Sequence, residues 1–194
     1  HLLSRRQRQM CIRDRNKEDV FISINIHEGL PYKVKTVKVE GEQLGLNDQL
    51  SELTKPVKIG ETYNAESVNQ VSSAIKDKLS VLGYAFATAN PNPVTNSADH
   101  TVDVVYTVDP GRRAYVRNVF VTGNTRTRDE VVRREVRQYE ASWFDSDKVK
   151  LSRDRIDRLG FFDEVTAEPV PVPGTRDEVD LKVHVKERPT GSIS

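Results

Sequence analysis

Apolar residues recur along this chain in two patterns, one typical of strands and one typical of helices. Residues 34–40 and 101–108 alternate between apolar and polar positions, which predicts two half-buried strands. Between them, apolar residues three or four positions apart predict a helix. Its apolar side consists of Val68, Val71, Ile75, Leu79 and Leu82. Asn64 is a favourable cap for the start of this helix, and Gly83 suits the left-handed turn after its end.

Two shorter elements complete this part of the chain. Leucines at helical spacing between residues 46 and 53 predict a short helix. Residues 85–90 predict a third strand, which we expect to end at Pro91 and Pro93, because proline cannot donate a hydrogen bond to a sheet ladder. The predicted order is therefore β-α-α-β-β.

The same order recurs in the second half of the chain. Residues 33–41 align with residues 115–123, with four identities at a separation of 82 residues. The Leu-Gly-aromatic segment at residues 82–84 recurs at residues 159–161, a separation of 77. A four-residue deletion within the second helix explains most of this drift and keeps its apolar side nearly in phase, because a helical turn takes about 3.6 residues. The sequence therefore predicts two copies of one α+β unit.

The first helix of the second copy is highly charged. Thr127 and Glu130 have the spacing of a capping box, which predicts that a helix begins between them. Asp129 and Arg133 lie four residues apart, so we expect an ion pair on the exposed side of this helix. Glu140 lies near its predicted end, where a carboxylate opposes the helix dipole. We infer that another interaction requires Glu140 there.

The remaining elements of the second copy follow in the same order. Asp145 is the predicted cap of its second helix, which ends at Gly160. Residues 162–167 and 179–185 predict its last two strands. Trp143 is expected to pack beneath the second helix, and an interface anchor is the alternative.

Composition and motifs argue against an enzyme. The 194 residues are 36% hydrophobic and 30% charged, which is ordinary for globular domains. No apolar run approaches the roughly 18 residues that a membrane-spanning helix needs. The four histidines are scattered, and neither a phosphate-binding glycine loop nor a nucleophile motif is present. We therefore expect no catalysis, no cofactor and no small-molecule substrate.

The first 15 residues differ from the rest of the chain. They carry five arginines and one aspartate, whereas the whole chain has a net charge of only +1. We expect residues 1–15 to be a non-native tail, and a basic arm that binds nucleic acid is the alternative. Cys11, the only cysteine, lies in this tail, so no disulfide framework is expected in the folded part. Residues 16–29 match the end of the first copy and predict the last strand of a preceding unit.

Together these features resemble the POTRA domains of outer-membrane assembly factors. The resemblance covers residues 17–194 and rests on the tandem order, the glycine after each first strand and the Leu-Gly-aromatic segments. Residues 185–192, Val-Lys-Glu-Arg-Pro-Thr-Gly-Ser, are similar to the exit of the last such domain toward a barrel. The resemblance implies that each unit is a three-stranded mixed sheet covered by two helices. It also implies that residues 30–111 are fourth-like, residues 112–188 are fifth-like and residues 189–194 begin the barrel.

The resemblance further implies a periplasmic scaffold in the machinery that folds and inserts β-barrel proteins into the outer membrane. The implied partners are an accessory lipoprotein such as BamD, unfolded outer-membrane proteins and the protein's own C-terminal barrel. Nucleic acid is not among them. A short proline-bearing turn at residues 110–111 predicts the stiff joint that a scaffold needs. The alternative within the fold is the POTRA region of a two-partner secretion or organelle import receptor.

Strand edges are the first predicted binding surface. An open sheet edge can accept an extended peptide as an additional strand, and the resemblance places the second strand of each unit at an edge. These strands supply Ala85, Phe86, Ala87, Thr88 and Ala89 in the first unit, and Phe162, Asp163, Glu164, Val165 and Thr166 in the second. The prolines that follow limit pairing, so edges that only avoid aggregation are the alternative.

A charged patch is the second predicted surface. The resemblance implies that Glu140 occupies the acidic position with which the last POTRA domain contacts the lipoprotein. Arg133, Arg134 and Arg137 surround it in the sequence, so the four residues predict a docking patch. The alternative is a salt-bridged, solvent-exposed helix face.

Overall fold

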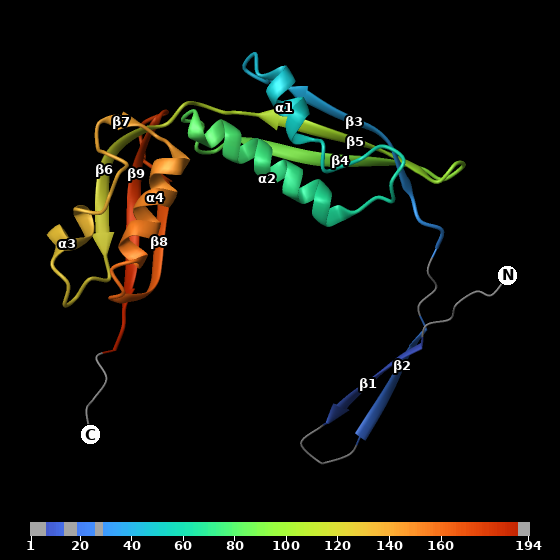
Figure 1. Ribbon diagram of the computed structural model, residues 1–194, viewed down its shortest axis with the longest axis horizontal. Coiled ribbons are helices and arrows are strands. Elements are labelled where there is room, and N and C mark those ends of the chain that lie inside the picture. Colours follow the sequence, from blue (N-terminus) through green and yellow to red (C-terminus); the bar gives the residue numbers. More distant parts are fainter. Residues whose placement is uncertain (1–6, 14–18, 26–28, 190–194) are drawn as a thin grey trace.

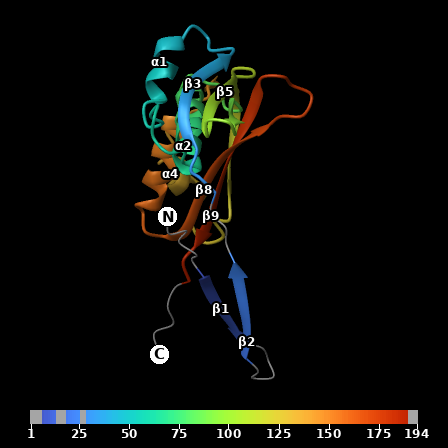
Figure 2. The ribbon, with the colours of Figure 1, turned by 90° about the vertical axis from the view of Figure 1, so that its right-hand side faces the viewer.

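The computed structural model describes residues 7–13, 19–25 and 29–189, and it contains the two predicted β-α-α-β-β units (Figure 1). Unit one consists of β3 (Lys33–Gly41), α1 (Asn47–Leu53), α2 (Ala65–Val81), β4 (Thr88–Asn96) and β5 (Thr101–Asp109). Unit two consists of β6 (Tyr115–Thr122), α3 (Asp129–Arg133), β7 (Ser142–Trp143), α4 (Ser146–Asp157), β8 (Phe162–Pro171) and β9 (Glu178–Glu187). The long helices cover one face of each sheet (Figure 2). Within the described residues, no helix combines the length and apolar character needed to cross a membrane.

Two strands precede unit one. β2 (Asp19–Asn25) lies where the last strand of a preceding unit is predicted. It pairs antiparallel with β1 (Gln7–Arg13), so that Met10 lies opposite Ile22. The sequence analysis does not predict this pairing, because the first 15 residues have no counterpart in the repeat. The non-native origin of that tail and its nucleic-acid alternative stay predictions.

Both sheets are mixed, as expected. The strand order is β3-β5-β4 in unit one and β7-β6-β9-β8 in unit two. In each unit the first long strand runs parallel to the last one, and the strand between them in sequence pairs antiparallel with the last. Unit two differs from the prediction in having four strands, because the two-residue β7 pairs with the start of β6. β4 and β8 lie at sheet edges, as the resemblance implied.

The glycine that follows each first strand is required by close packing. Gly41 and Gly123 have φ angles of +95° and +87°, in the left-handed region. A Cβ atom at Gly41 would lie 2.2 Å from the carbonyl oxygen of Val108, and one at Gly123 would lie 1.9 Å from that of Val185. Any larger residue would therefore push the first strand away from the last one.

The long helix of unit one begins where the sequence predicts and ends one residue before the predicted Leu82. The side chain of Asn64 accepts two backbone amides of the first turn, at 2.9 and 3.3 Å. Four of the five predicted apolar residues are buried: Val68, Val71, Ile75 and Leu79. The prediction that Leu82 joins them is wrong, because the helix ends at Val81 and Leu82 is 39% exposed.

The edge strands are longer than predicted and continue through their prolines. β4 begins at Thr88 and ends at Asn96, so Pro91 and Pro93 do not terminate it. The two prolines lie two residues apart, opposite Tyr106 and Val104 of β5. Alternate residues of an edge strand point their N–H groups away from the ladder, and proline is tolerated at those positions. β8 extends to Pro171 for the same reason.

The two units meet where α2 ends. The amide of Ala114 donates to the carbonyl oxygen of Gly83 at 2.7 Å. Arg113 Nε donates to the carbonyl oxygen of Leu82 at 2.9 Å. These hydrogen bonds connect the start of unit two to the two residues that directly follow α2, and they restrain the joint between the units.

Trp143 belongs to this joint. The prediction that it packs beneath the second helix is wrong, because its side chain is 47% exposed. The guanidinium carbon of Arg113 lies 4.5 Å from the centre of the indole ring, and Tyr115 packs edge-on against the indole at 5.6 Å. Pairing of β7 with β6 places Trp143 opposite Tyr115 and therefore beside the joint.

Candidate functional site

The predicted docking patch lies on a short helix and on the loop that follows it. α3 ends at Arg133, so Glu140 lies in the loop, seven residues beyond the helix. The expectation that Glu140 opposes a helix dipole is therefore wrong. The helix stops because the amide of Arg137 donates to Ser152 Oγ at 2.7 Å, and the Arg137 guanidinium donates to the Arg134 carbonyl at 2.9 Å. Side chains thus satisfy backbone groups that a longer helix would have paired.

Arg133 and Glu140 converge on the outer edge of β6. Val119 donates its N–H to Glu140 Oε1 at 2.7 Å, and its carbonyl oxygen accepts a hydrogen bond from Arg133 Nη2 at 2.7 Å. β7 covers this edge only at Tyr115 and Val116. Farther along β6, the two side chains therefore take the place of a neighbouring strand.

The two charged side chains also contact each other. Arg133 Nη1 lies 3.7 Å from Glu140 Oε1, and Arg133 Nε forms the predicted ion pair with Asp129. The side chain of Glu140 remains 48% exposed. Its second oxygen, Oε2, has no hydrogen-bond partner among the described residues. The patch therefore keeps one carboxylate oxygen available for an external donor.

A small hollow lies beside this carboxylate. It has a volume of about 190 Å³ and is lined by Val119, Arg133, Val136, Tyr139 and Glu140. Tyr139, which the sequence analysis did not select, is 63% exposed. Arg134 is also exposed, but the Arg137 guanidinium donates to the carbonyls of Arg134 and Val136, just after α3. The structure thus groups Arg133, Tyr139 and Glu140, and it separates Arg137 from them.

The loop carrying these residues depends on two buried polar side chains that the sequence analysis missed. Gln138 and Ser152 are both 0% exposed. Gln138 Oε1 accepts the amide of Asp145, the residue that caps α4, at 2.8 Å. A comparison of the two copies could have identified them, because Val57 and Val71 occupy the corresponding positions of unit one at a separation of 81.

Only two of the five residues predicted to form the strand edge of unit one lie in a strand. Ala85, Phe86 and Ala87 precede β4, because the chain is still turning after α2: the amide of Ala87 donates to the carbonyl of Tyr84 at 3.2 Å. Thr88 and Ala89 do lie in β4. The carbonyl of Ala89 already accepts a hydrogen bond from Ser72.

The predicted edge of unit two lies entirely in β8, which includes Phe162, Asp163, Glu164, Val165 and Thr166. Asp163 is the additional residue at a register shift between Phe162 and Glu164, and it pairs with Arg188 at 3.2 Å. Pro169 and Pro171 occupy positions of β8 whose N–H groups would point away from β9. Val165 and Ala167 lie two or more residues earlier in the same alternation. Both therefore point their N–H groups outward, and unlike the prolines they can donate to an added strand.

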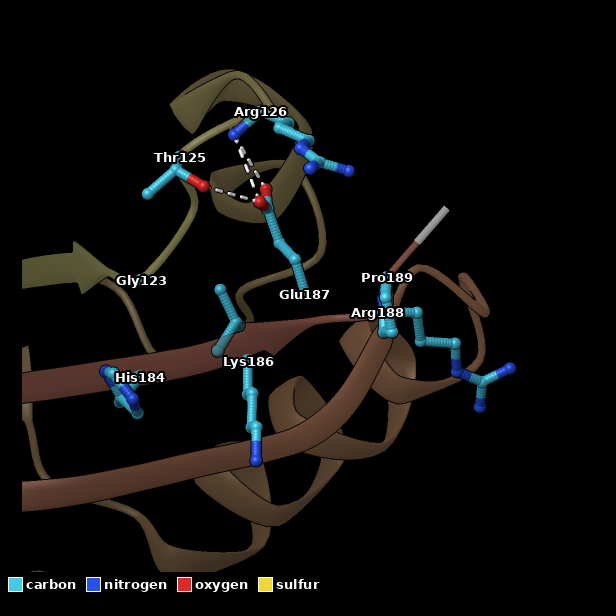
Figure 3. Close-up of a pocket in the computed structure, with 9 residues that line it drawn as sticks. Gly123, Thr125, Arg126, His184, Lys186, Glu187, Arg188 and Pro189 are labelled. Atoms are coloured by element: carbon cyan, nitrogen blue, oxygen red, sulfur yellow. Dashed lines mark hydrogen bonds between the residues drawn. The ribbon is translucent and has the colours of Figure 1, made fainter. Parts of the chain in front are cut away.

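The end of β9 carries a carboxylate site that the sequence analysis did not predict. Glu187 accepts hydrogen bonds from Thr125 Oγ1 at 2.8 Å and from the amide of Arg126 at 2.9 Å (Figure 3). The amide of Thr127 also donates to it, at 2.7 Å. The predicted capping box is thus not formed, since the helix has no side-chain cap and the Thr127 amide binds Glu187. The site borders a hollow of about 500 Å³ that His184, Lys186 and Arg188 also line.

These hydrogen bonds stabilise the ionised form of Glu187. Above all the amide of Thr127, and then the Thr125 hydroxyl and the Arg126 amide, lower the pKa of Glu187 from its ordinary value of 4.5 to about 2. The stabilisation is therefore complete above pH 4.5 and is lost as the pH falls toward 2.

Glu187→Gln should lower the urea midpoint at pH 7, because the amide replaces a charged acceptor of three hydrogen bonds. The difference between wild type and variant should shrink as the pH is lowered from 4.5 to 2, which urea titrations at several pH values can measure. Glu178→Gln, on the same strand, is the control. A constant difference across this pH range would contradict the assignment.

Comparison with known proteins identifies the family. The family model described as POTRA, surface antigen variable number repeat, matches residues 32–111 and 114–188. The outer membrane protein assembly factor BamA of Neisseria meningitidis serogroup B is 38% identical over 172 residues, which cover 89% of this chain and 22% of the relative. BamA of Nitratidesulfovibrio vulgaris is 33% identical over 183 residues, which cover 93% of this chain and 23% of the relative. The chain thus spans less than a quarter of the length of these two relatives.

Solved structures agree with this result. Haemophilus influenzae BamA POTRA3-5 superposes with a TM-score of 0.84 at 33% identity, covering 93% of this chain and 71% of that one. BamA from Haemophilus ducreyi lacking POTRA domains 1–3 superposes with a TM-score of 0.67 at 34% identity, and the match covers 81% of this chain and 30% of that one.

The relatives also define the kind of activity to expect. POTRA domains of BamA are non-catalytic. No three potential metal-binding side chains come together in the described part of the chain. The chain belongs to the POTRA family, and its two domains are of the BamA type, the periplasmic portion of an outer-membrane protein.

Proposed function

We propose that the two units are the fourth and fifth POTRA domains of a BamA-type protein, and that they act as a periplasmic scaffold for β-barrel assembly. The match to a BamA structure that lacks domains 1–3 supports this position in the chain. The proposed partners are an accessory lipoprotein such as BamD, unfolded outer-membrane proteins and the barrel of the same protein.

The observation that carries the lipoprotein proposal is the half-exposed Glu140 side chain, whose carboxylate uses only one of its two oxygens within the domain. Oε1 accepts a hydrogen bond from the Val119 amide at 2.7 Å, and this bond holds the carboxylate against β6. Oε2 has no hydrogen-bond partner among the described residues. A carboxylate held in place in this way loses little conformational entropy when it binds a basic side chain of a partner. The hollow beside it can accept an apolar side chain next to that charge.

Glu140→Gln is expected to weaken lipoprotein binding about tenfold. It removes the negative charge that would pair with a basic side chain of the lipoprotein, but it keeps an oxygen for the Val119 amide. Glu140→Lys should weaken it further, about a hundredfold, because it places like charges together. Titration of purified BamD-type lipoprotein by biolayer interferometry measures both. Glu130→Gln makes the same charge change on α3 and should bind within about twofold of wild type. Wild-type affinity of Glu140→Gln would refute the docking site.

Client binding is proposed for the outer edge of β8. Val165 and Ala167 supply two successive outward N–H groups there, ahead of the outward Pro169 and Pro171. On β4 the outward Pro91 and Pro93 separate the outward N–H groups, and the carbonyl of Ala89 is already bound to Ser72. An extended client strand would therefore find more complementary backbone groups on unit two than on unit one.

A further inference from the structure

Gln138 and Ser152 form a fully buried polar network in unit two. Ser152 Oγ donates to the carbonyl oxygen of Lys148 at 2.7 Å and accepts the amide of Arg137 at 2.7 Å. It also lies 3.4 Å from the amide of Gln138, close to the limit for a hydrogen bond. One side chain on α4 thus holds two consecutive backbone amides of the loop after α3.

The Gln138 side chain holds the other end of the same loop. Its Nε2 donates to Ser142 Oγ at 2.9 Å and to the carbonyl oxygen of Trp143 at 3.1 Å. Its Oε1 accepts the amide of Asp145 at 2.8 Å. Both donors and the acceptor of the amide are therefore used, and residues 137–145 are held to α4 at each end.

Unit one shows that the fold does not need this network. The caps Asn64 and Asp145 align at a separation of 81, and at the same separation Val57 and Val71 correspond to Gln138 and Ser152. Both valines are buried, with 8% and 1% exposure. A buried valine fills space but imposes no hydrogen-bond direction on the backbone beside it, whereas a satisfied polar network favours one backbone conformation.

The held loop carries the patch. Gln138 lies between Arg137 and Tyr139, and Glu140 follows directly. The direction of the backbone at Gln138 therefore determines whether Tyr139 lines the hollow and whether Glu140 reaches the Val119 amide. We infer that Gln138 and Ser152 are positioning residues for the docking patch, present in unit two because only that unit must present a fixed loop to a partner. This inference rests on the proposed docking function.

Ser152→Val and Ser152→Thr separate hydrogen bonding from volume, because valine and threonine have the same shape and only threonine keeps the hydroxyl. In the full chain, hydrogen exchange at the amides of Val119, Arg137 and Gln138 should be at least tenfold faster in Ser152→Val than in Ser152→Thr. The affinity for purified BamD-type lipoprotein should fall about tenfold in Ser152→Val, and Ser152→Thr should restore most of it. Equal exchange and equal affinity in the two variants would overturn the inference.

The double variant Gln138→Val/Ser152→Val gives unit two the residues of unit one. It should unfold cooperatively and still show fast exchange in the loop and weak binding, so a loss of affinity cannot be ascribed to an unfolded domain. If it binds like wild type with a protected loop, the network has no positioning role. If Glu140→Gln and Tyr139→Ala leave affinity unchanged, the docking function fails, and the exchange comparison alone then decides the role of the network.

Discussion

Gly123→Ala is expected to destabilise unit two by about 3 kcal/mol or more, because two penalties add. The residue has a φ angle of +87°, which alanine adopts only at a cost. In addition, the new Cβ would lie 1.9 Å from the carbonyl oxygen of Val185, a backbone atom that cannot rotate away. β6 and β9, the two central strands of the sheet, would have to separate at the end of β6. This end lies next to the site where Glu187 binds the loop before α3.

Gly174→Ala is the matched control for this variant. Gly174 also has a positive φ angle, +81°, but a Cβ there would meet no atom within 4 Å. Its cost should therefore be that of the backbone conformation alone, about 1 kcal/mol. Urea unfolding followed by the fluorescence of Trp143, the only tryptophan, measures both variants. Similar midpoints for the two variants would show that the close approach to Val185 is relieved at little cost.

Elements defined by local signals could be predicted from the sequence. Asn64 and Asp145 cap α2 and α4 through their own side chains, and their hydrogen bonds reach only two or three residues ahead. The glycines that follow the first strands could be recognised from the repeat. Their physical reason, a carbonyl of the last strand, could be seen only in three dimensions.

The ends of α3 and β4 could not be predicted, because distant groups determine them. α3 stops when Ser152, on another helix, takes the amide of Arg137. β4 passes through Pro91 because it is an edge strand, and the sequence alone does not show which ladder positions face outward. The position of Glu140 against Val119 is a consequence of the first of these effects, so its structural role could not be predicted either.

Ala167→Pro is expected to abolish most strand addition at β8 while leaving the domain folded. Ala167 lies opposite Val183 and two residues before Pro169, so its N–H points outward and is not needed by the ladder with β9. β8 already contains Pro169 and Pro171 at the next two outward positions, so proline at residue 167 is compatible with the strand. The substitution removes the outward N–H donor of residue 167 from the open edge. Binding of a synthetic peptide with alternating apolar and polar residues should weaken at least about tenfold in an NMR titration.

Thr166→Pro places the same residue one position earlier, where the N–H faces β9 opposite His184. It should destabilise unit two by about 2 kcal/mol or more, because a ladder hydrogen bond is lost within the sheet. The two substitutions thus change the same chemistry on opposite sides of one strand. If Ala167→Pro destabilises unit two as much as Thr166→Pro, the assignment of outward groups is wrong. If it folds normally and still binds the peptide at full affinity, client strands use a surface other than this edge.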